Sequence, residues 1–257
     1  MFSDTQIREV FHFCFLQRLL SVSDAGIYVL KGGINLRFFF NSPRYSEDMD
    51  LDVLAGSVAT LKKNGYKILE DGSFQRSLRI FSIDAIEIND PNKAKHTETT
   101  QRFRCTVVRE SGQRLPTKVE FSRRINDPED NAAIEYVDAD IALRYRKLAY
   151  RCRHYTGSAA IVQKIEALAG RTVTQARDVF DLAILIHGGH LAVAAQQGAL
   201  ARAPLTDAIE CLTALSWDDY EGQVVEFLDT TSRNEFGTKA AWDAMQTSVY
   251  DSLQEYA

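Results

Sequence analysis

The sequence predicts an α+β fold in which a mixed sheet with helices occupies the first part of the chain and helices alone occupy the second. Runs that alternate apolar and polar side chains, as strands do, recur between residues 27 and 122. After Asn126-Asp-Pro128 the chain becomes rich in Ala, Leu, Arg and Tyr at helical spacing, with almost no strand pattern. We therefore predict a first domain over residues 1–135 and a helical domain over residues 136–257, with a site in the cleft between them.

Local patterns assign the individual elements. Ser3 and Gln6 form a capping box at the start of the first helix. Gly32-Gly33 breaks a short buried strand and opens a second helix, and Ser111-Gly-Gln113 indicates a hairpin. The predicted helices cover residues 3–20, 34–40, 58–64, 139–153, 158–169, 174–187, 205–215, 218–230 and 237–255. The predicted strands cover residues 27–30, 48–54, 78–88, 102–110 and 117–122.

Composition excludes several classes of protein. With 45% hydrophobic and 25% charged residues and only five prolines, the chain is neither disordered nor collagen-like. The four cysteines lack a CxxC spacing and the five histidines lack an HExxH pattern, so we expect reduced thiols and no metal site built from histidine or cysteine. No apolar run approaches the length of a membrane span and no secretion signal is visible, so we expect a cytoplasmic protein that does not contact membranes.

The net charge of -5 at first disfavours a nucleic-acid partner, but the charge is unevenly distributed. Residues 142–177 hold eight basic and one acidic side chain, whereas residues 178–257 hold three basic and thirteen acidic ones. If residues 139–153 are helical, Arg144, Lys147 and Arg151 share one face of that helix. With nearby tyrosines they could bind a phosphate backbone and unpaired bases, or simply form a solvated helix face.

The predicted strand that begins at Asp48 is rich in aspartates and gives the strongest indication of a catalytic site. Residues two apart on a strand point to the same side, so Asp48, Asp50 and Asp52 face together while Met49 and Leu51 enter the core. Carboxylates at this spacing repel one another unless a cation lies among them, and Mg²⁺ prefers carboxylate and phosphate oxygens. The alternative is a solvated edge strand whose charges deter aggregation.

Lys31-Gly32-Gly33 precedes this strand and leads into a helix. Glycines permit close approach of a ligand, and the helix start offers free N–H groups, to which Lys31 adds a positive charge. A simple turn from strand to helix is the alternative. Combined with the acidic strand, the segment provides one element for phosphates and one for a metal.

These two segments resemble the signature of the AbiEii/AbiGii family of nucleotidyltransferase toxins, within the DNA polymerase β-like nucleotidyltransferase superfamily. The similar residues are Leu30-Lys-Gly-Gly-Ile-Asn-Leu-Arg37 and Arg44-Tyr-Ser-Glu-Asp-Met-Asp-Leu-Asp52, although many relatives have a smaller pair where this chain has Ile34-Asn35. The resemblance implies that Asp48 and Asp50 are catalytic metal ligands for Mg²⁺ or Mn²⁺.

The resemblance also implies phosphate contacts from Lys31, Gly32 and Gly33, whereas Asp52 supports the site or is solvated. Arg44 and Ser46 could donate hydrogen bonds to a triphosphate, and the alternative for Ser46 is a cap of the turn.

Superfamily members often carry a third carboxylate on a neighbouring strand. Glu120 is the candidate here, and Asp84 and Glu87 are weaker ones. The alternative for Glu120 is a surface pair with Lys118, two residues away on the same strand face.

A second block supports the same family. Lys164 lies among apolar residues on its helix, where an ammonium group needs a partner or reaches solvent. Lys164-x-x-Ala-Leu168 followed by Arg177-Asp-x-x-Asp-Leu182 resembles the family's helical-lobe motif, which implies catalytic roles for Lys164 and Asp178. From spacing alone, Arg177 and Asp181 form a pair four residues apart.

The resemblance implies an enzyme that uses an NTP and a divalent metal to transfer a nucleoside monophosphate to RNA. We expect the tRNA 3′ acceptor end as the acceptor, a block of translation, and a separately encoded antitoxin in a toxin–antitoxin or phage-defence pair. The alternatives are transfer to a protein or small-molecule hydroxyl, and a non-catalytic nucleotide- or RNA-binding module.

Overall fold

The computed structural model describes residues 2–90, 96–123 and 129–257. The chain forms two compact units, one from residues 1–39 with Tyr45–His154 and the other from Phe40–Arg44 with Tyr155–Ala257. The sequence predicts a division after residue 135, whereas the units divide after His154, because the further strand β7 (Arg151–Tyr155) joins the sheet before the helical unit begins.

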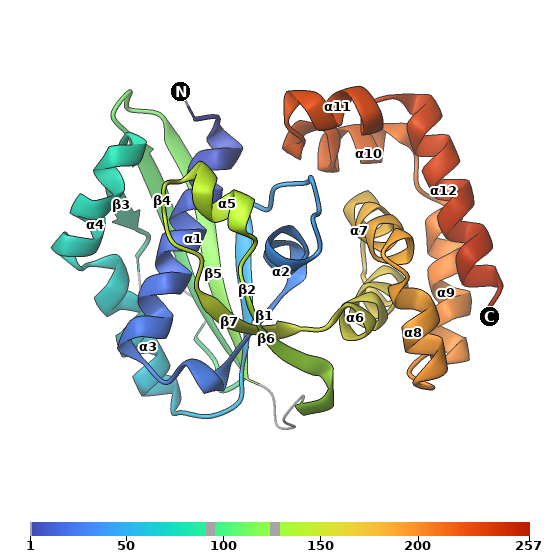
Figure 1. Ribbon diagram of the computed structural model, residues 1–257, viewed down its shortest axis with the longest axis horizontal. Coiled ribbons are helices and arrows are strands. Elements are labelled where there is room, and N and C mark those ends of the chain that lie inside the picture. The colour runs from blue at the N-terminus through green and yellow to red at the C-terminus, as the bar shows by residue number, and fades with distance from the viewer. Residues whose placement is uncertain (1, 91–95, 124–128) are drawn as a thin grey trace. The chain divides into compact units, whose positions relative to one another are not determined.

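The first unit contains a mixed seven-stranded sheet in the order β3-β4-β5-β2-β1-β7-β6 (Figure 1). Strands β1–β2, β3–β4 and β4–β5 are antiparallel, whereas β2–β5 and β1–β7 are parallel. The strands are β1 Tyr28–Lys31, β2 Asp48–Val53, β3 Ile83–Ile88, β4 Thr100–Arg109, β5 Arg114–Arg123, β6 Ala132–Tyr136 and β7 Arg151–Tyr155. The helices of this unit are α1 Asp4–Val22, α2 Gly32–Phe39, α3 Val58–Leu69, α4 Gly72–Leu78 and α5 Ala139–Arg144. Short 3-10 segments are η1 Ala25–Ile27, η2 Arg79–Phe81 and η4 Glu129–Asn131.

One face of the sheet is apolar and forms the core of this unit. Side chains such as Leu51, Phe103 and Phe121 are buried on it. Helices α1, α3 and α4 lie on this side of the sheet (Figure 1). A Cβ at Gly65 of α3 would lie 2.4 Å from the Phe103 ring, so only glycine allows this close packing. The capping box of Ser3 and Gln6 begins α1 as predicted. Helix α2 adds Ile34 and Phe38 to this core. The opposite face carries charged side chains of β1, β2 and β5, and we call it the polar face.

Several element predictions for the first unit are wrong. Residues 72–81 form α4 and η2, so β3 begins only at Ile83. The Asp71 side chain caps α4 by accepting hydrogen bonds from two backbone N–H groups. Strand β6 was not predicted. The predicted helix over 139–153 ends at Arg144, and β7 alternates exposed Arg151 with buried Cys152 and His154, which is the two-residue period of a strand.

The second unit is helical and packs around α7. Its helices are α6 Gly157–Gly170, α7 Ala176–His187, α8 His190–Gln196, α9 Arg202–Thr213, α10 Trp217–Gln223, α11 Thr230–Phe236 and α12 Lys239–Gln254, with η5 Val225–Phe227. Val179, Phe180 and Leu182 of α7 are fully buried, and Tyr220 stacks on Trp242 with ring centroids 4.7 Å apart. The single helix predicted over 218–230 is broken into α10, η5 and the start of α11.

Within the described residues, no single helix is both long and apolar enough to cross a membrane. The pair α7 and α8 reaches these criteria together, but the two helices are bent by 78° at their junction.

Candidate functional site

The register of the sheet brings charged side chains together on the polar face. Asp50 of β2 lies opposite Glu120 of β5 and Lys31 of β1, and Asp48 lies opposite Lys118. On the next strand, Arg102 lies opposite Glu120. Because directly paired residues point to the same side of a sheet, these side chains share one face, on which the adjacent carboxylates of Asp50 and Glu120 are flanked by Lys31 and Arg102.

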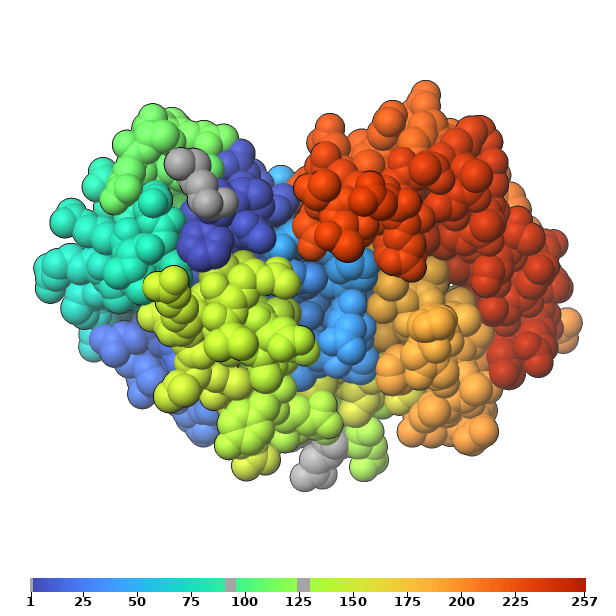
Figure 2. Space-filling view, turned by 45° about the horizontal axis from the view of Figure 1, so that its top comes forward, coloured from blue at the N-terminus to red at the C-terminus, as the bar shows by residue number. Residues whose placement is uncertain are grey.

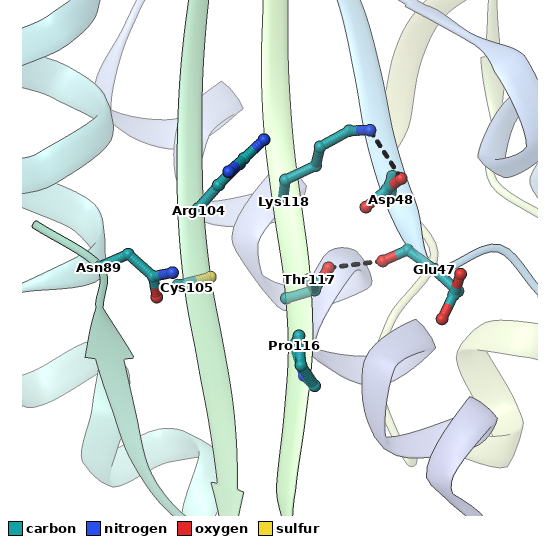
Figure 3. Close-up of a pocket in the computed structure, with 8 residues that line it drawn as sticks. All are labelled: Glu47, Asp48, Asn89, Arg104, Cys105, Pro116, Thr117 and Lys118. Atoms are coloured by element: carbon teal, nitrogen blue, oxygen red, sulfur yellow. Dashed lines mark hydrogen bonds and ion pairs between the residues drawn. The ribbon is translucent and has the colours of Figure 1, made fainter. Parts of the chain in front are cut away.

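The Asp48 carboxylate is paired with Lys118, whose Nζ lies 2.8 Å away (Figure 3). Both side chains are about 30% exposed, so the pair is accessible to a ligand. The predicted alternative pairing of Lys118 with Glu120 is wrong: Glu120 instead accepts a hydrogen bond from Arg102 Nε at 2.5 Å.

Among the candidates for a third carboxylate, the sheet register favours Glu120. It lies directly opposite Asp50 on the adjacent parallel strand. Asp84 and Glu87 lie on the edge strand β3, which β4 and β5 separate from β2, and Glu87 is engaged with Arg114.

Asp50 differs from its neighbours because no described residue forms a hydrogen bond or ion pair with its carboxylate. Burial raises the pKa of Asp50, and although Lys31 and Lys118 oppose this effect, Glu120 and Asp48 reinforce it. A partly buried carboxylate with two acidic neighbours and no partner is a site that a cation would stabilise.

The glycine turn lies directly beside Asp50. Gly32 has a φ of +68°, and a Cβ there would lie 3.1 Å from Asp50 Oδ2, so glycine is needed both for the backbone conformation and for the space. Gly32 and Gly33 form the first residues of α2, where backbone N–H groups have no partner within the helix. An anion near Asp50 could therefore accept hydrogen bonds from the backbone N–H groups at the start of α2.

Lys31 is held by Asp52, with Nζ 2.6 Å from Oδ1. Asp52 is almost completely buried, so it supports Lys31 and is not solvated. Lys31 is 17% exposed and keeps its ammonium group beside the start of α2.

The structure provides neither Arg44 nor Ser46 as a free donor. Arg44 belongs to the helical unit, is buried, and makes a two-pronged contact with Asp181 of α7, with Nη2 2.9 Å from both carboxylate oxygens. Ser46 donates from its hydroxyl to the Asp48 carbonyl at 3.0 Å, so it fixes the turn before β2.

In the helical unit, Lys164 lies between two buried carboxylates. Its Nζ is 2.9 Å from Asp178 Oδ1 and 2.6 Å from Asp181 Oδ2, and Arg171 Nε binds the other oxygen of Asp178 at 2.7 Å. Burial alone would lower the pKa of Lys164, but Asp181 and Asp178 outweigh it and raise this pKa. Lys164 is therefore charged and held, and does not reach freely into solvent.

Asp181 is the centre of this cluster, which the sequence did not reveal. Burial would raise its pKa, but Arg44 and Lys164 lower it. The predicted pairing of Asp181 with Arg177 is wrong, because Asp181 is buried and faces Arg44 and Lys164 instead.

The basic segment does not form one helical face. Arg144 ends α5 and donates to the Tyr45 hydroxyl at 2.9 Å, Lys147 lies in the loop after the turn at residues 145–146, and Arg151 begins β7. The yellow-green surface in Figure 2 includes this segment. The tyrosines at positions 145 and 155 are buried, and the hydroxyl of Tyr150 is bonded to the Phe13 carbonyl, so these rings do not form a base-stacking surface.

Across the described ranges, no group of three or more His, Cys, Asp or Glu side chains is arranged to hold a metal ion. The donors nevertheless fit a magnesium-type ion, because Mg²⁺ is commonly held by one or two carboxylates together with substrate phosphates. Asp48 and Asp50 supply two carboxylates on one strand face, and Asp50 has no competing partner among the described residues.

Sequence reasoning missed Arg102 and Arg104. The two arginines lie two residues apart on β4, and this spacing in a strand places both side chains on one face. Only the pairing of β4 with β5 and of β5 with β2 places that face beside Asp48 and Asp50.

The chain is similar to a known protein family and to several solved structures. A family model described as "Nucleotidyl transferase AbiEii toxin, Type IV TA system" matches residues 14–251. Among solved structures, MenT4, a nucleotidyltransferase toxin from Mycobacterium tuberculosis, is 16% identical with a TM-score of 0.61, over 98% of this chain and 84% of that chain. JHP933 from Helicobacter pylori is 17% identical with a TM-score of 0.54, over 100% of this chain and 96% of that chain. No curated protein matches the sequence. The structural likeness confirms the predicted α+β nucleotidyltransferase fold.

Proposed function

Because this chain belongs to the AbiEii nucleotidyl transferase toxin family of type IV toxin–antitoxin systems, we propose that it transfers a nucleoside monophosphate from an NTP to RNA. The proposed acceptor is the 3′ end of tRNA, and its modification would block translation. The observation that carries the proposal is the Asp50 carboxylate, which has no hydrogen-bond or ion-pair partner among the described residues and lies against the glycine turn at the start of α2.

Asp48 and Asp50 would hold a divalent metal, Mg²⁺ or Mn²⁺. When bound, such an ion supplies charge neutralisation for the triphosphate and activates the acceptor hydroxyl. The two carboxylates are preorganised by β2, whose Met49 and Leu51 are fully buried on the other face.

Lys31 and the backbone of Gly32 and Gly33 would bind the triphosphate. Their contribution is electrostatic: an ammonium group and free N–H groups stabilise negative charge on the departing pyrophosphate. Asp52 would keep Lys31 charged and correctly directed through the 2.6 Å ion pair.

Lys164 and Asp178 would act from the helical unit, with Lys164 contacting a substrate phosphate. Asp178 is completely buried and already accepts from Lys164 and Arg171, which supports a role in orienting the lysine and not in taking a proton. Arg44 is engaged with Asp181, so we assign it to supporting Lys164 through that shared carboxylate.

The proposal is tested by incubating the protein with α-³²P-labelled NTPs, Mg²⁺ and total tRNA. We expect label on tRNA with the wild type, and none above background with Asp48→Asn or Asp50→Asn. Asp84→Asn is the matched control, because Asp84 is an exposed aspartate on another strand of the same sheet, and it should keep full activity.

The other outcomes separate the alternatives. Label on added protein or small-molecule acceptors but not on RNA would favour a different acceptor class. Salt-dependent RNA binding without transfer to any acceptor would indicate a non-catalytic binding module.

The biological setting follows from the family. A type IV system pairs the toxin with a separately encoded antitoxin, and we propose that growth arrest by this chain serves such a system or a phage-defence response. tRNA and NTPs occur in the cytoplasm, so that is the proposed place of action. Expression with the neighbouring gene should relieve arrest by the wild type, whereas Asp50→Asn should cause no arrest to relieve.

A further inference from the structure

A cavity of about 240 Å³ lies in the sheet unit immediately beside Asp48 (Figure 3). Its polar lining includes Lys118 and Arg104 from neighbouring strands and Asn89, which follows β3. Figure 3 shows Arg104 and Lys118 extending in the same direction from β4 and β5. The cavity therefore has hydrogen-bond donors next to a proposed catalytic carboxylate.

Two of these donors are unused within the described part of the chain. Lys118 is paired with Asp48, but no described residue forms a hydrogen bond or ion pair with the Arg104 guanidinium or the Asn89 side-chain amide. A backbone bond from Asn89 N–H to the Arg104 carbonyl, at 3.0 Å, holds the two residues together. An exposed guanidinium beside an amide is well suited to a phosphate, which accepts several hydrogen bonds at once.

The acidic residue at the edge of the cavity does not cancel this character. The Glu47 carboxylate points away from Lys118 and Arg104 in Figure 3 and lies 3.8 Å from Arg8. The Glu47 carbonyl accepts from Thr117 at 2.6 Å, which ties the start of β2 to β5.

The strand order decides which phosphate this cavity suits. In the sequence β4-β5-β2-β1, the glycine turn follows β1 on one side of the β2 carboxylates, and Arg104 and Lys118 lie on the other side. Adjacent strands are separated by ~4.8 Å, so Arg104 lies two strands, roughly 10 Å, beyond β2. Phosphoryl transfer places the leaving and attacking oxygens in line on opposite sides of the phosphorus.

The geometry points to the cavity as an acceptor subsite, in which Arg104 and Asn89 bind a backbone phosphodiester of the RNA near its reacting 3′ hydroxyl. This inference rests on the proposed function and adds to it the place where the acceptor lies. A phosphate at this site could in chemical terms also come from the NTP, and the experiment distinguishes the two sources.

Binding is measured first, without turnover, using 5′-fluorescein-labelled tRNA and fluorescence anisotropy over a series of salt concentrations. Arg104→Gln should weaken binding by about tenfold, since it removes one charge-assisted contact. It should also lower the slope of log K against log salt by about 0.7 to 0.9, the value for one phosphate contact. Arg104→Lys should restore most of the slope.

Arg79→Gln is the matched control, because Arg79 is exposed, lies outside the cavity and changes the net charge equally. It should leave both the affinity and the slope unchanged. Asn89→Asp, which places a negative charge in the cavity, should weaken binding at least as much as Arg104→Gln. Far-UV circular dichroism verifies that each variant is folded.

Kinetics then identify the source of the phosphate. Arg104→Gln should raise the apparent KM for tRNA and leave the apparent KM for a mixture of the four NTPs unchanged. A rise confined to the apparent KM for the NTPs would assign the cavity to the triphosphate and overturn the inference. Equal behaviour of Arg104→Gln and Arg79→Gln in the binding assay would overturn it as well.

The two proposals fail in different ways. If the wild type binds tRNA in a manner that depends on Arg104 but transfers nothing, the subsite stands and the proposed activity fails. If the wild type labels tRNA and Arg104→Gln is indistinguishable from it in binding and KM, the activity stands and the subsite fails. If the wild type neither binds nor labels tRNA, both are wrong.

Discussion

His12 makes the stability of the sheet unit depend on pH in a way that the structure defines. The side chain is completely buried in α1, and its Nε2 lies 2.8 Å from Thr117 Oγ1. That hydroxyl donates to the Glu47 carbonyl at 2.6 Å, so Nε2 must carry the proton that His12 shares with Thr117. Nδ1 is then an unprotonated nitrogen, and it is buried without a hydrogen-bond partner among the described residues.

A second proton on His12 would place an unpaired N–H and a charge in the core. Burial lowers the pKa of His12 from 6.5 to about 4; the negative charge of Asp48 opposes this shift and Arg8 adds to it. As the pH falls below 6.5, the unfolded chain takes up a proton that the folded chain resists. The contribution of neutral His12 to the free energy of unfolding is therefore complete above pH 6.5 and is lost between pH 6.5 and 4. One pKa unit is worth about 1.4 kcal/mol, which gives a total of roughly 3 kcal/mol, of which about 2 kcal/mol is already lost at pH 5.

The assay must report on the sheet unit, and both tryptophans, Trp217 and Trp242, lie in the helical unit. Hydrogen exchange of β5 amides, followed by mass spectrometry between pH 7.5 and 5 and corrected for the intrinsic exchange rate, gives the free energy of opening of the correct unit. His12→Gln is the control, because glutamine keeps an N–H donor for Thr117 but does not titrate. The free energy of opening should fall by about 2 kcal/mol more in the wild type than in His12→Gln. The same pH dependence in both proteins would refute the reasoning.

Three further substitutions test the site and its support. Gly32→Ala should cost about 1 kcal/mol in thermal stability, because φ is +68°, and should abolish tRNA labelling, because the new methyl group would crowd the carboxylate 3.1 Å away. Asp181→Ala should destabilise the helical unit by about 3 to 5 kcal/mol in urea unfolding followed by tryptophan fluorescence, because it leaves a buried arginine and lysine without a shared partner. Glu120→Gln should reduce the rate of tRNA labelling by about 100-fold or more if it acts as the third carboxylate.

Each of these substitutions has a matched control in the chain. Gly112→Ala also changes a glycine with positive φ, +82°, but no atom lies within 4 Å of its Cβ position, so labelling should persist. Asp243→Ala breaks an exposed pair with Lys239 and should cost under about 0.5 kcal/mol. Glu87→Gln removes another arginine-paired carboxylate and should leave the rate unchanged. If a control behaves like its partner, the role assigned to that site residue is wrong.

Local patterns in the sequence predicted the elements that carry the site. The alternation of acidic and apolar residues from Asp48 predicted β2 and its polar face, and Gly32-Gly33 predicted the break between a buried strand and a helix. The helix that contains Lys164 follows from helical spacing. These predictions succeed because the periods of helices and strands, and the freedom of glycine, act over a few neighbouring residues.

The same local reasoning failed at β7. The many Arg, Ala, Leu and Tyr residues from residue 139 onward favour a helix by propensity. The structure instead has a strand beside β1, in which buried Cys152 and His154 alternate with the more accessible Arg151 and Arg153. A place in the sheet outweighs a weak intrinsic preference, because pairing and burial contribute more free energy than propensity does. Arg144, Lys147 and Arg151 consequently lie on a helix end, a loop and a strand.

The sequence by itself therefore determined which side chains are presented together by one element: the carboxylates of β2, the glycine turn, and Lys164 within an apolar helix face. The tertiary structure alone decided which residues from different elements lie together: Lys118 with Asp48, Glu120 with Asp50, Arg44 with Asp181, and Arg104 with Lys118. The reason is that strand register and ion pairing between residues as far apart as 44 and 181 depend on how the whole chain packs, and no local window of sequence contains that information.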